Sequence, residues 1–200
     1  MVKLIQKSTE MNDYLSSNRY IDLSDPSIQR KAKELFVSPS SENEKIKTAF
    51  EFVRDGIKHS RDIDSEIVTV SASDALRHGE GICLSKSLLL AALLRYEGIP
   101  AGLCYQRLAS NDTPTGYIIH GLNAVFLSSE NKWIRLDARG NKPGVDAQFS
   151  VAEERIAFPV KAERGETDLP AIYADPPSSV MEAWAKCRSH REYRFDTAEL

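Results

Sequence analysis

The hydrophobic pattern of the chain is dominated by one run near its middle. From Leu88 to Leu94 every residue is leucine or alanine, so a helix here has no polar face. A helix that is apolar on all sides lies buried in the centre of a domain. We expect it to begin at Cys83, after the turn at Gly81, and to end at Gly98, because glycine accommodates the left-handed C′ conformation and Pro100 cannot continue a helix.

Shorter helices are predicted before this central helix. A helix over Pro26–Phe36 has Asp25 as its N-cap and proline at the first helical position. Ser41–Glu44 is a capping box, and the helix that it opens repeats apolar residues at helical spacing as far as Ile57. A capped helical turn over Ser73–His78 completes this helical half.

The pattern changes to strands after the central helix. Ala101–Leu108, Tyr117–Leu127 and Lys132–Ala138 are predicted strands, separated by polar turns. Beyond residue 150, scattered prolines and charges predict an extended segment with only Ile156–Phe158 as a strand, and then a short helix that Ser179 caps. Helices followed by strands predict an α+β fold, in which the buried helix packs on an antiparallel sheet or small barrel.

Length and composition predict one domain with three parts. These are an N-terminal helical arm over residues 1–43, a core over residues 44–150 and a C-terminal extension over residues 151–200 that wraps the core. Hydrophobic residues make up 42% of the chain and charged residues 28%, which is typical of a globular protein with a sizeable core. A net charge of −3, without a basic cluster interleaved with aromatic residues, predicts no nucleic-acid partner.

Cysteine usage and the N-terminus bear on the compartment. Three cysteines are an odd and small number, which argues against a disulfide framework and for a reducing environment. Met1–Lys7 lacks the apolar core of a secretory signal, and the run from Leu88 to Leu94 is too short to cross a bilayer. We therefore expect a cytoplasmic protein with no membrane partner.

Metal and cofactor motifs are not recognisable. Cys104 and Cys187 have no paired spacing with each other or with histidines, so we expect no zinc site. Gly79-Glu80-Gly81 is not followed by Gly-Lys-Ser/Thr, so no phosphate-binding loop is predicted. We expect the protein to work without a metal or cofactor.

Cys83 is the candidate nucleophile. A cysteine reacts as the thiolate, and the partial positive charge at a helix N-terminus lowers the pKa of a thiol placed there. Gly81 is expected to let a substrate approach the backbone nearby. The alternative is that Cys83 is a small buried hydrophobic residue, and taken alone this alternative is favoured, because free cysteines are among the most buried residues.

A nucleophile needs a base that a third group holds in place. His120 lies in a predicted strand, and Gly121 beside it is expected to leave room near the ring. Asp137 ends an otherwise apolar strand, so it needs a partner if it is buried. The alternatives are that His120 is a hydrogen-bonded sheet residue and that Asp137 is a turn residue.

The register of the predicted hairpin decides whether these two side chains meet. If Leu127 pairs with Lys132, Asp137 faces Leu122, and alternation places His120 on the same face as a diagonal neighbour. Diagonal neighbours have Cα atoms about 7–8 Å apart, which an imidazole and a carboxylate can span. A shift of one residue would put them on opposite faces.

Three blocks of sequence carry a resemblance to a known family. They are Gly81-Ile82-Cys83 with the following Leu89–Arg95 and Gly98–Ala101, His120-Gly121-Leu122-Asn123-Ala124-Val125, and Trp133-Ile134-Arg135-Leu136-Asp137. Over roughly Glu44 to Phe149 the chain resembles the transglutaminase-like superfamily, and the stretch after Asp137 is similar to its small bacterial branch. The resemblance implies a papain/transglutaminase-like core with Cys83 as nucleophile, His120 as general base and acid, and Asp137 as the orienting carboxylate.

The chain departs from the commoner family pattern in three places. Leu122 stands where an aromatic residue often follows the histidine, Ala138-Arg139 where proline and threonine often follow the aspartate, and His59 where an aromatic residue is common. The backbone N–H of Cys83 is the expected first oxyanion donor, and the His59 side chain or a backbone group is a candidate for the second. His59 and Tyr105 are candidate cleft-lining residues, with strand surface as the alternative for Tyr105.

These residues predict cysteine-dependent acyl transfer at an amide bond of a peptide or protein substrate. With water as the acceptor the reaction is hydrolysis, as in a peptidase or amidase, and this is the reading we favour. Three alternatives stay open: an amine-accepting transglutaminase, acyl transfer from a thioester to an arylamine, and a non-catalytic protein-binding domain that keeps the fold.

Overall fold

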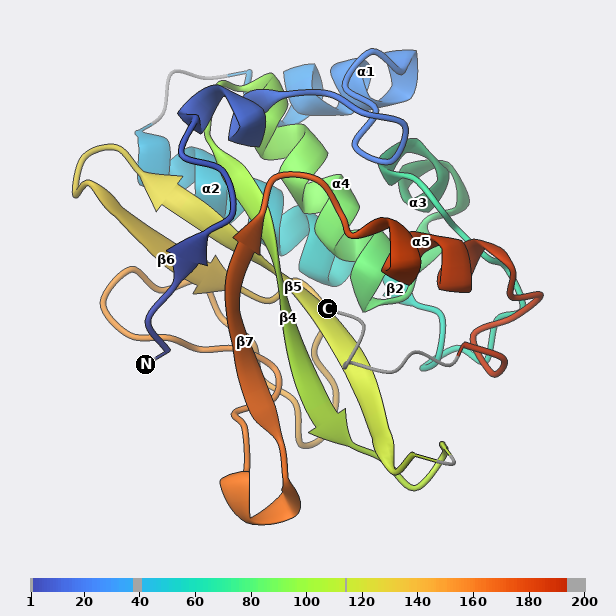
Figure 1. Ribbon diagram of the computed structural model, residues 1–200. Coiled ribbons are helices and arrows are strands. Elements are labelled where there is room, and N and C mark those ends of the chain that lie inside the picture. The colour runs from blue at the N-terminus through green and yellow to red at the C-terminus, as the bar shows by residue number, and fades with distance from the viewer. Residues whose placement is uncertain (1, 38–40, 114, 194–200) are drawn as a thin grey trace.

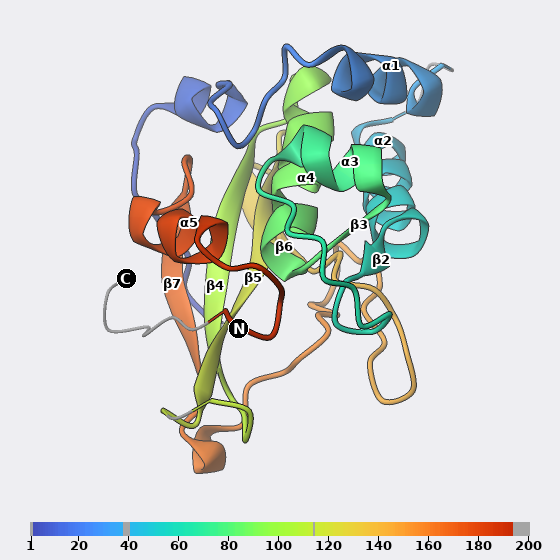
Figure 2. The ribbon, with the colours of Figure 1, turned by 90° about the vertical axis from the view of Figure 1, so that its right-hand side faces the viewer.

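The central helix is the axis of the fold. The computed structural model describes residues 2–37, 41–113 and 115–193. Helix α4 spans Cys83–Tyr96, as predicted, and every residue from Leu84 to Arg95 is buried. It lies between a sheet on one side and three helices on the other (Figures 1 and 2), which are α1 (Pro26–Leu35), α2 (Glu42–Glu51) and α3 (Ala72–His78).

The predicted caps of the first two helices are confirmed, and that of the last helix is wrong. The Asp25 side chain accepts from the first turn of α1, and Ser41 forms both hydrogen bonds of a capping box on α2. In α3 the capping residue is Ser71. The final helix, α5 (Ser178–Ala185), begins after Pro177, whose carbonyl accepts the first helical hydrogen bond, so Ser179 lies inside it.

The helical path of the chain extends beyond the α-helical part of α2. It continues into a π-helical turn, η2 (Phe52–Gly56). The carbonyls at the end of this turn are bound by a buried lysine on α4, because Lys86 Nζ donates to the carbonyl oxygens of Arg54 and Ile57. This links the turn to the helix that carries Cys83.

Five strands form the main sheet. In spatial order they are β1 (Ile5–Gln6), β7 (Thr167–Tyr173), β4 (Ala101–Ala109), β5 (Tyr117–Leu127) and β6 (Lys132–Leu136). Neighbours are antiparallel except β1, which is parallel to β7. The three strands expected after the central helix are confirmed, and Leu127 pairs with Lys132, which is the register that brings His120 and Asp137 to one face.

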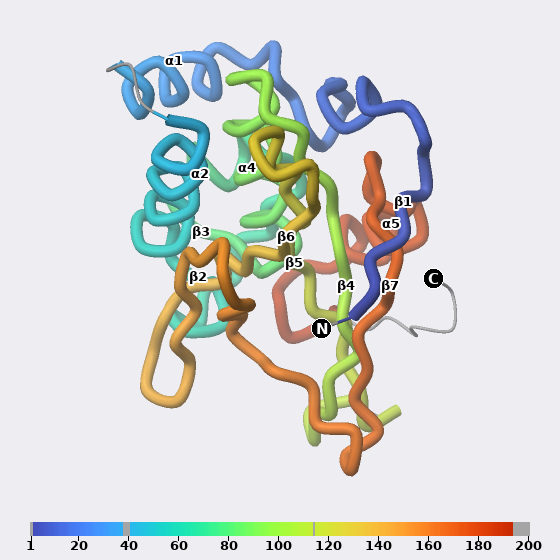
Figure 3. The backbone as a smooth tube through the Cα atoms, turned by 90° about the vertical axis from the view of Figure 1, so that its left-hand side faces the viewer, coloured from blue at the N-terminus to red at the C-terminus, as the bar shows by residue number. Residues whose placement is uncertain are grey.

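Strand β7 was not expected from the sequence. The prediction of a strand at Ile156–Phe158 is wrong, and Thr167–Tyr173 pairs with β4 instead. Pro170 lies inside β7, where the register between β4 and β7 shifts, and a residue without an N–H is tolerated at such an irregularity. The main sheet therefore takes β1 from the predicted arm and β7 from the predicted extension, side by side in Figure 3.

A small second sheet sits at the start of α4. Strands β2 (Lys58–His59) and β3 (Glu80–Gly81) pair in parallel, with His59 opposite Gly81. This pairing fixes the loop after His59 beside the N-terminus of α4. In the part of the chain that the structure describes, no helix has the length and apolar character needed to span a membrane.

Candidate active site

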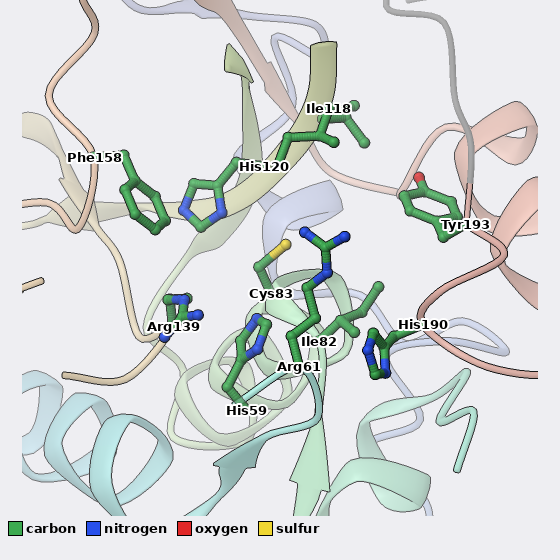
Figure 4. A pocket seen from close by; sticks show the side chains of 11 residues that line it. His59, Arg61, Ile82, Cys83, Ile118, His120, Arg139, Phe158, His190 and Tyr193 are labelled. Atoms are coloured by element: carbon green, nitrogen blue, oxygen red, sulfur yellow. The ribbon is translucent and has the colours of Figure 1, made fainter. Parts of the chain in front are cut away.

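Cys83 is the first residue of α4 and lines a cavity at the N-terminus of that helix (Figure 4). Ile82 precedes the helix and provides no side-chain cap, so the amides of the first turn keep their partial positive charge beside the thiol. The Gly121 backbone N–H, from strand β5, donates to the sulfur over 3.4 Å. A helix end and a strand amide thus both stabilise negative charge on Cys83.

His120 and Asp137 form a buried pair at the end of the β5–β6 hairpin. His120 Nε2 lies 2.8 Å from Asp137 Oδ2. The carboxylate also accepts backbone N–H groups from Arg139, at 3.1 Å to Oδ1, and from Ala157, at 3.0 Å to Oδ2. With Nε2 engaged, Nδ1 is the ring nitrogen left for Cys83, to which His120 is hydrogen-bonded.

The three groups shift one another's proton affinity. Burial raises the pKa of Cys83, but the charge and hydrogen bond of His120 outweigh it, and the net pKa lies below the usual range. Burial lowers the pKa of His120, yet Asp137 and Cys83 together raise it well above its usual value. Burial raises the pKa of Asp137, and His120 with the two backbone N–H groups brings it below normal. The favoured state is a thiolate beside an imidazolium.

The two glycines of this region serve packing. A Cβ on Gly81 would lie 3.0 Å from Ser85 Cβ and from Thr69 Oγ1, so the expected room for substrate is filled by protein. A Cβ on Gly121 would lie 2.9 Å from Leu84 Cδ2, so the space beside His120 is occupied by the first turn of α4. Both glycines allow the helix that carries Cys83 to approach its neighbouring strands closely.

Of the two candidate cleft residues, the structure places one in the cavity. His59 lines it, and the ring is buried with no partner at Nδ1 among the described residues. Burial and the nearby Arg139 charge hold the pKa of His59 well below its usual range, so the ring is neutral. Tyr105 lies outside the lining: its ring is buried and packs edge-on against Tyr173, with the centroids 5.7 Å apart.

Most of the cavity wall comes from residues that the sequence did not single out as site residues. They are Arg61, Ile82, Ile118, Ile119, Arg139, Phe158, His190 and Tyr193. The Phe158 ring packs edge-on against His120, with centroids 5.1 Å apart, and shields the pair with Asp137 from water. Its only signal in the sequence was a short apolar stretch in a polar segment.

The other cysteines are in different surroundings. Cys104 is fully buried, and burial raises the pKa of its thiol to about 12, which keeps it protonated. Cys187 lies on the segment after α5, where its thiol donates to the Ala183 carbonyl. Within the described ranges, no group of three or more histidine, cysteine, aspartate or glutamate side chains is placed to hold a metal ion.

Fold and site together define a class of protein in which a cysteine at a helix N-terminus faces a strand-borne histidine and a carboxylate. The sequence pattern of the transglutaminase-like superfamily matches residues 29–138, just over half of the chain, and the chain belongs to that superfamily. None of the curated proteins compared with the chain matches it.

Two solved structures are similar. A candidate cysteine protease from Cytophaga hutchinsonii gives a TM-score of 0.52 at 20% identity, over 66% of this chain and 43% of that one. A structure described as a TGase gives a TM-score of 0.43 at 16% identity, over 66% of this chain and 33% of that one. The chain thus spans less than half of the length of either. At 20% identity the first of them establishes the fold alone.

Proposed function

We propose that the protein hydrolyses amide bonds of a peptide or protein substrate through Cys83, His120 and Asp137. The observation that supports this most is that the Cys83 thiol and the His120 ring line one cavity, with the buried Asp137 carboxylate bound to the ring. Burying a thiolate and an imidazolium costs desolvation free energy. A binding domain gains nothing from such a pair, whereas a cysteine enzyme needs it. We therefore favour catalysis over a non-catalytic role.

The reaction proceeds in two steps with balanced protons. The Cys83 thiolate attacks the amide carbonyl, and as the C–N bond breaks, the His120 imidazolium gives its proton to the leaving amine. The product is a thioester on Cys83. A water molecule then attacks the thioester while His120 takes its proton, the C–S bond breaks, and the acid leaves with the thiolate–imidazolium pair restored. Asp137 holds the His120 ring and stabilises its positive charge throughout.

Two donors are assigned to the oxyanion of the tetrahedral intermediate. The backbone N–H of Cys83 lies at the uncapped start of α4 and is the first. The second is the His59 ring, which is neutral and lines the cavity beside the sulfur (Figure 4). A neutral imidazole donates through one nitrogen, and here it does so without placing a second positive charge beside His120.

Water is favoured over an amine as the acceptor because cationic side chains outnumber carboxylates around the mouth of the cavity. Arg61 and Arg139 line the cavity itself, and Lys142 and Arg191 line the adjoining outer cavity, where the carboxylates of Asp62 and Asp112 offset them only in part. A protonated lysine approaching as acyl acceptor would meet like charges, which disfavours its association. An uncharged water molecule meets no such barrier.

The test is alkylation of the native protein with iodoacetamide across pH, with the modified cysteine identified by mass spectrometry. We expect Cys83 to react faster than free cysteine near pH 6, whereas buried Cys104 stays unmodified. A His120→Ala variant loses the enhanced rate. Equal rates for Cys83 and free cysteine at pH 6 would contradict the proposal. Peptide turnover with and without an added lysine-containing acceptor then separates hydrolysis from amine transfer.

A further inference from the structure

Arg61 stands at the junction of two cavities. It lines the inner cavity that holds Cys83 and the adjoining outer one, as do Arg139, Phe158 and His190. Figure 4 shows Arg61 among the lining side chains of the inner cavity, with its guanidinium beside the Cys83 sulfur in this view. A substrate whose carbonyl reaches Cys83 from the outer cavity therefore passes this side chain.

The other cations around the junction already have acceptors. The Arg139 guanidinium forms a two-pronged ion pair with Asp62, whose carboxylate Lys142 shares at 2.7 Å. Arg191 is paired with Asp64. The carboxylates on the loop after His59 are thus already bound by other side chains, and none is left to neutralise Arg61.

Arg61 differs from these arginines in having its donors unfilled. Among the described residues its one ion pair is with Asp112, whose nearest oxygen lies 3.7 Å away on a side chain that is 70% exposed. No hydrogen bond from its guanidinium is formed within that part of the chain. By contrast, the Arg95 guanidinium donates hydrogen bonds to three backbone carbonyls, and the Arg135 guanidinium is paired with two carboxylates. Arg61 thus holds a planar fork of free N–H groups toward the cavity.

A second observation indicates that this space is built for a ligand. The Nδ1 atom of buried His59 is unpartnered among the described residues, and the ring faces the same cavity. The remaining wall is largely apolar, formed by side chains such as Ile82, Ile118 and Phe158. Apolar walls exclude water, and the attraction between a guanidinium and an anion is stronger where water is excluded.

We propose that Arg61 binds a carboxylate of the acyl donor, so that the substrates of this enzyme are amides with an acidic group next to the scissile carbonyl. The inference rests on the proposed function and adds its substrate class. Guanidinium and carboxylate match in geometry and form two parallel hydrogen bonds, which positions the carbonyl as well as binding it. Asp112, on its exposed loop, is the group that the substrate carboxylate displaces.

The test uses two alkylating reagents that differ in charge. Cys83 displaces iodide from both iodoacetate and iodoacetamide, and only iodoacetate carries a carboxylate. We expect the ratio of the iodoacetate rate to the iodoacetamide rate to fall about fivefold or more in Arg61→Gln, which corresponds to the upper range of a partly exposed ion pair. The His120 charge is the same in both proteins, so the change in ratio isolates Arg61.

Two further variants sharpen the result. Arg77→Gln on α3 removes one positive charge from a side chain that is 56% exposed and paired with Asp25 and Asp74, so its ratio should stay at the wild-type value. Asp112→Asn removes the competing carboxylate and should raise the ratio. An unchanged ratio in Arg61→Gln, or an equal fall in Arg77→Gln, would overturn the proposal.

The outcomes also separate this inference from the proposed function. If iodoacetamide alkylates Cys83 no faster than free cysteine, the nucleophile itself is wrong. If that rate is high and Arg61→Gln leaves the ratio unchanged, only the substrate class is wrong. For turnover, peptide pairs that differ in one glutamate or glutamine beside the scissile amide should differ in KM with wild type, and this difference should be lost in Arg61→Gln.

Discussion

His120 Nε2 and Asp137 Oδ2 lie 2.8 Å apart, although the residues are 17 positions apart in sequence, with His120 on β5 and Asp137 directly after β6. The contact depends on the pairing of Leu127 with Lys132, since the sheet alternates its side chains. Both groups are buried, and the charge of each is the largest influence that favours the ionised form of the other. The properties of Cys83 therefore depend on a hairpin register set at Leu127 and Lys132, more than 40 positions further along the chain.

Replacing Asp137 with asparagine should weaken the thiolate. The amide keeps an acceptor oxygen for one of the two backbone N–H groups and removes the charge beside His120, so the pKa of His120 should fall by about 1–3 units. Less imidazolium means less stabilisation of the thiolate, so the pKa of Cys83 should rise. The check is the pH profile of alkylation by iodoacetamide, whose midpoint should move to higher pH. Asp146→Asn, at an exposed carboxylate, is the control, and an identical profile in both variants would sink the assignment.

Replacing His59 should slow peptide hydrolysis but leave the alkylation of Cys83 unchanged. Only hydrolysis passes through an oxyanion, so His59→Ala should lower kcat for peptide hydrolysis about 100-fold, the usual cost of one oxyanion donor. The rate of Cys83 alkylation by iodoacetamide should be unchanged, and His59→Gln, which keeps an N–H donor, should recover part of kcat. If alkylation falls as much as hydrolysis, His59 is supporting the fold of the site instead.

A side chain at position 121 should disturb the start of α4. In Gly121→Ala the new methyl group meets Leu84 Cδ2, and a forced shift of this kind in a packed core costs about 1–3 kcal/mol. We expect a lower free energy of unfolding and slower alkylation of Cys83. Leu84→Ala in the same protein removes the clash, so the double variant should lose less than the sum of the two single changes. Simple additivity, measured by urea denaturation, would contradict this account.

Lys86 should give the protein a pH-dependent stability. Burial lowers the pKa of Lys86 to about 7, so between that pH and its ordinary value of 10.5 the unfolded chain binds more protons than the folded one. Stability contributed by Lys86 therefore rises with pH in this window, by at most about 1.4 kcal/mol per pH unit. The free energy of unfolding of wild type minus that of Lys86→Met should grow from pH 7 to pH 10. A difference that is flat with pH would refute the lowered pKa.

His120 also makes the free energy of unfolding depend on pH, and it does so in both wild type and Lys86→Met. Its raised pKa means that the folded state binds more protons, so its contribution is complete below the unfolded pKa and is lost as pH rises through the folded one. The two residues therefore oppose each other in the alkaline range. Because His120 is present in both proteins, subtracting the variant from wild type leaves the Lys86 contribution alone.

The features that were predicted correctly are those that residues close together in the sequence determine. The apolar run of α4, the glycine at its end and the strand pattern around a short turn each depend on neighbouring residues, and together they specified the register that joins His120 to Asp137. The three sequence blocks that contain Cys83, His120 and Asp137 could be recognised because each lies in or directly beside one of these elements.

The features that were missed depend on distant partners. Strand β7 contains Pro170 and an acidic residue, Asp168, which is tolerated because Arg135 on β6 binds its carboxylate. Arg61 and Phe158 reach the cavity from loops without periodicity, and their position is fixed by the small β2–β3 sheet and by a hydrogen bond from Gln106 to the Phe158 carbonyl. No pattern within either loop indicates these contacts.

Part of the cavity wall comes from a different stretch of the chain than the reacting groups. Cys83, His120 and Asp137 fall within the stretch that matches the superfamily, whereas Phe158, His190 and other parts of the wall come after its end at residue 138. The reacting groups and Arg61 thus lie in the matched stretch, and the last third of the chain completes the wall around them. Exchanging the last third of the chain between relatives is, on this view, a route to new selectivity with the same chemistry.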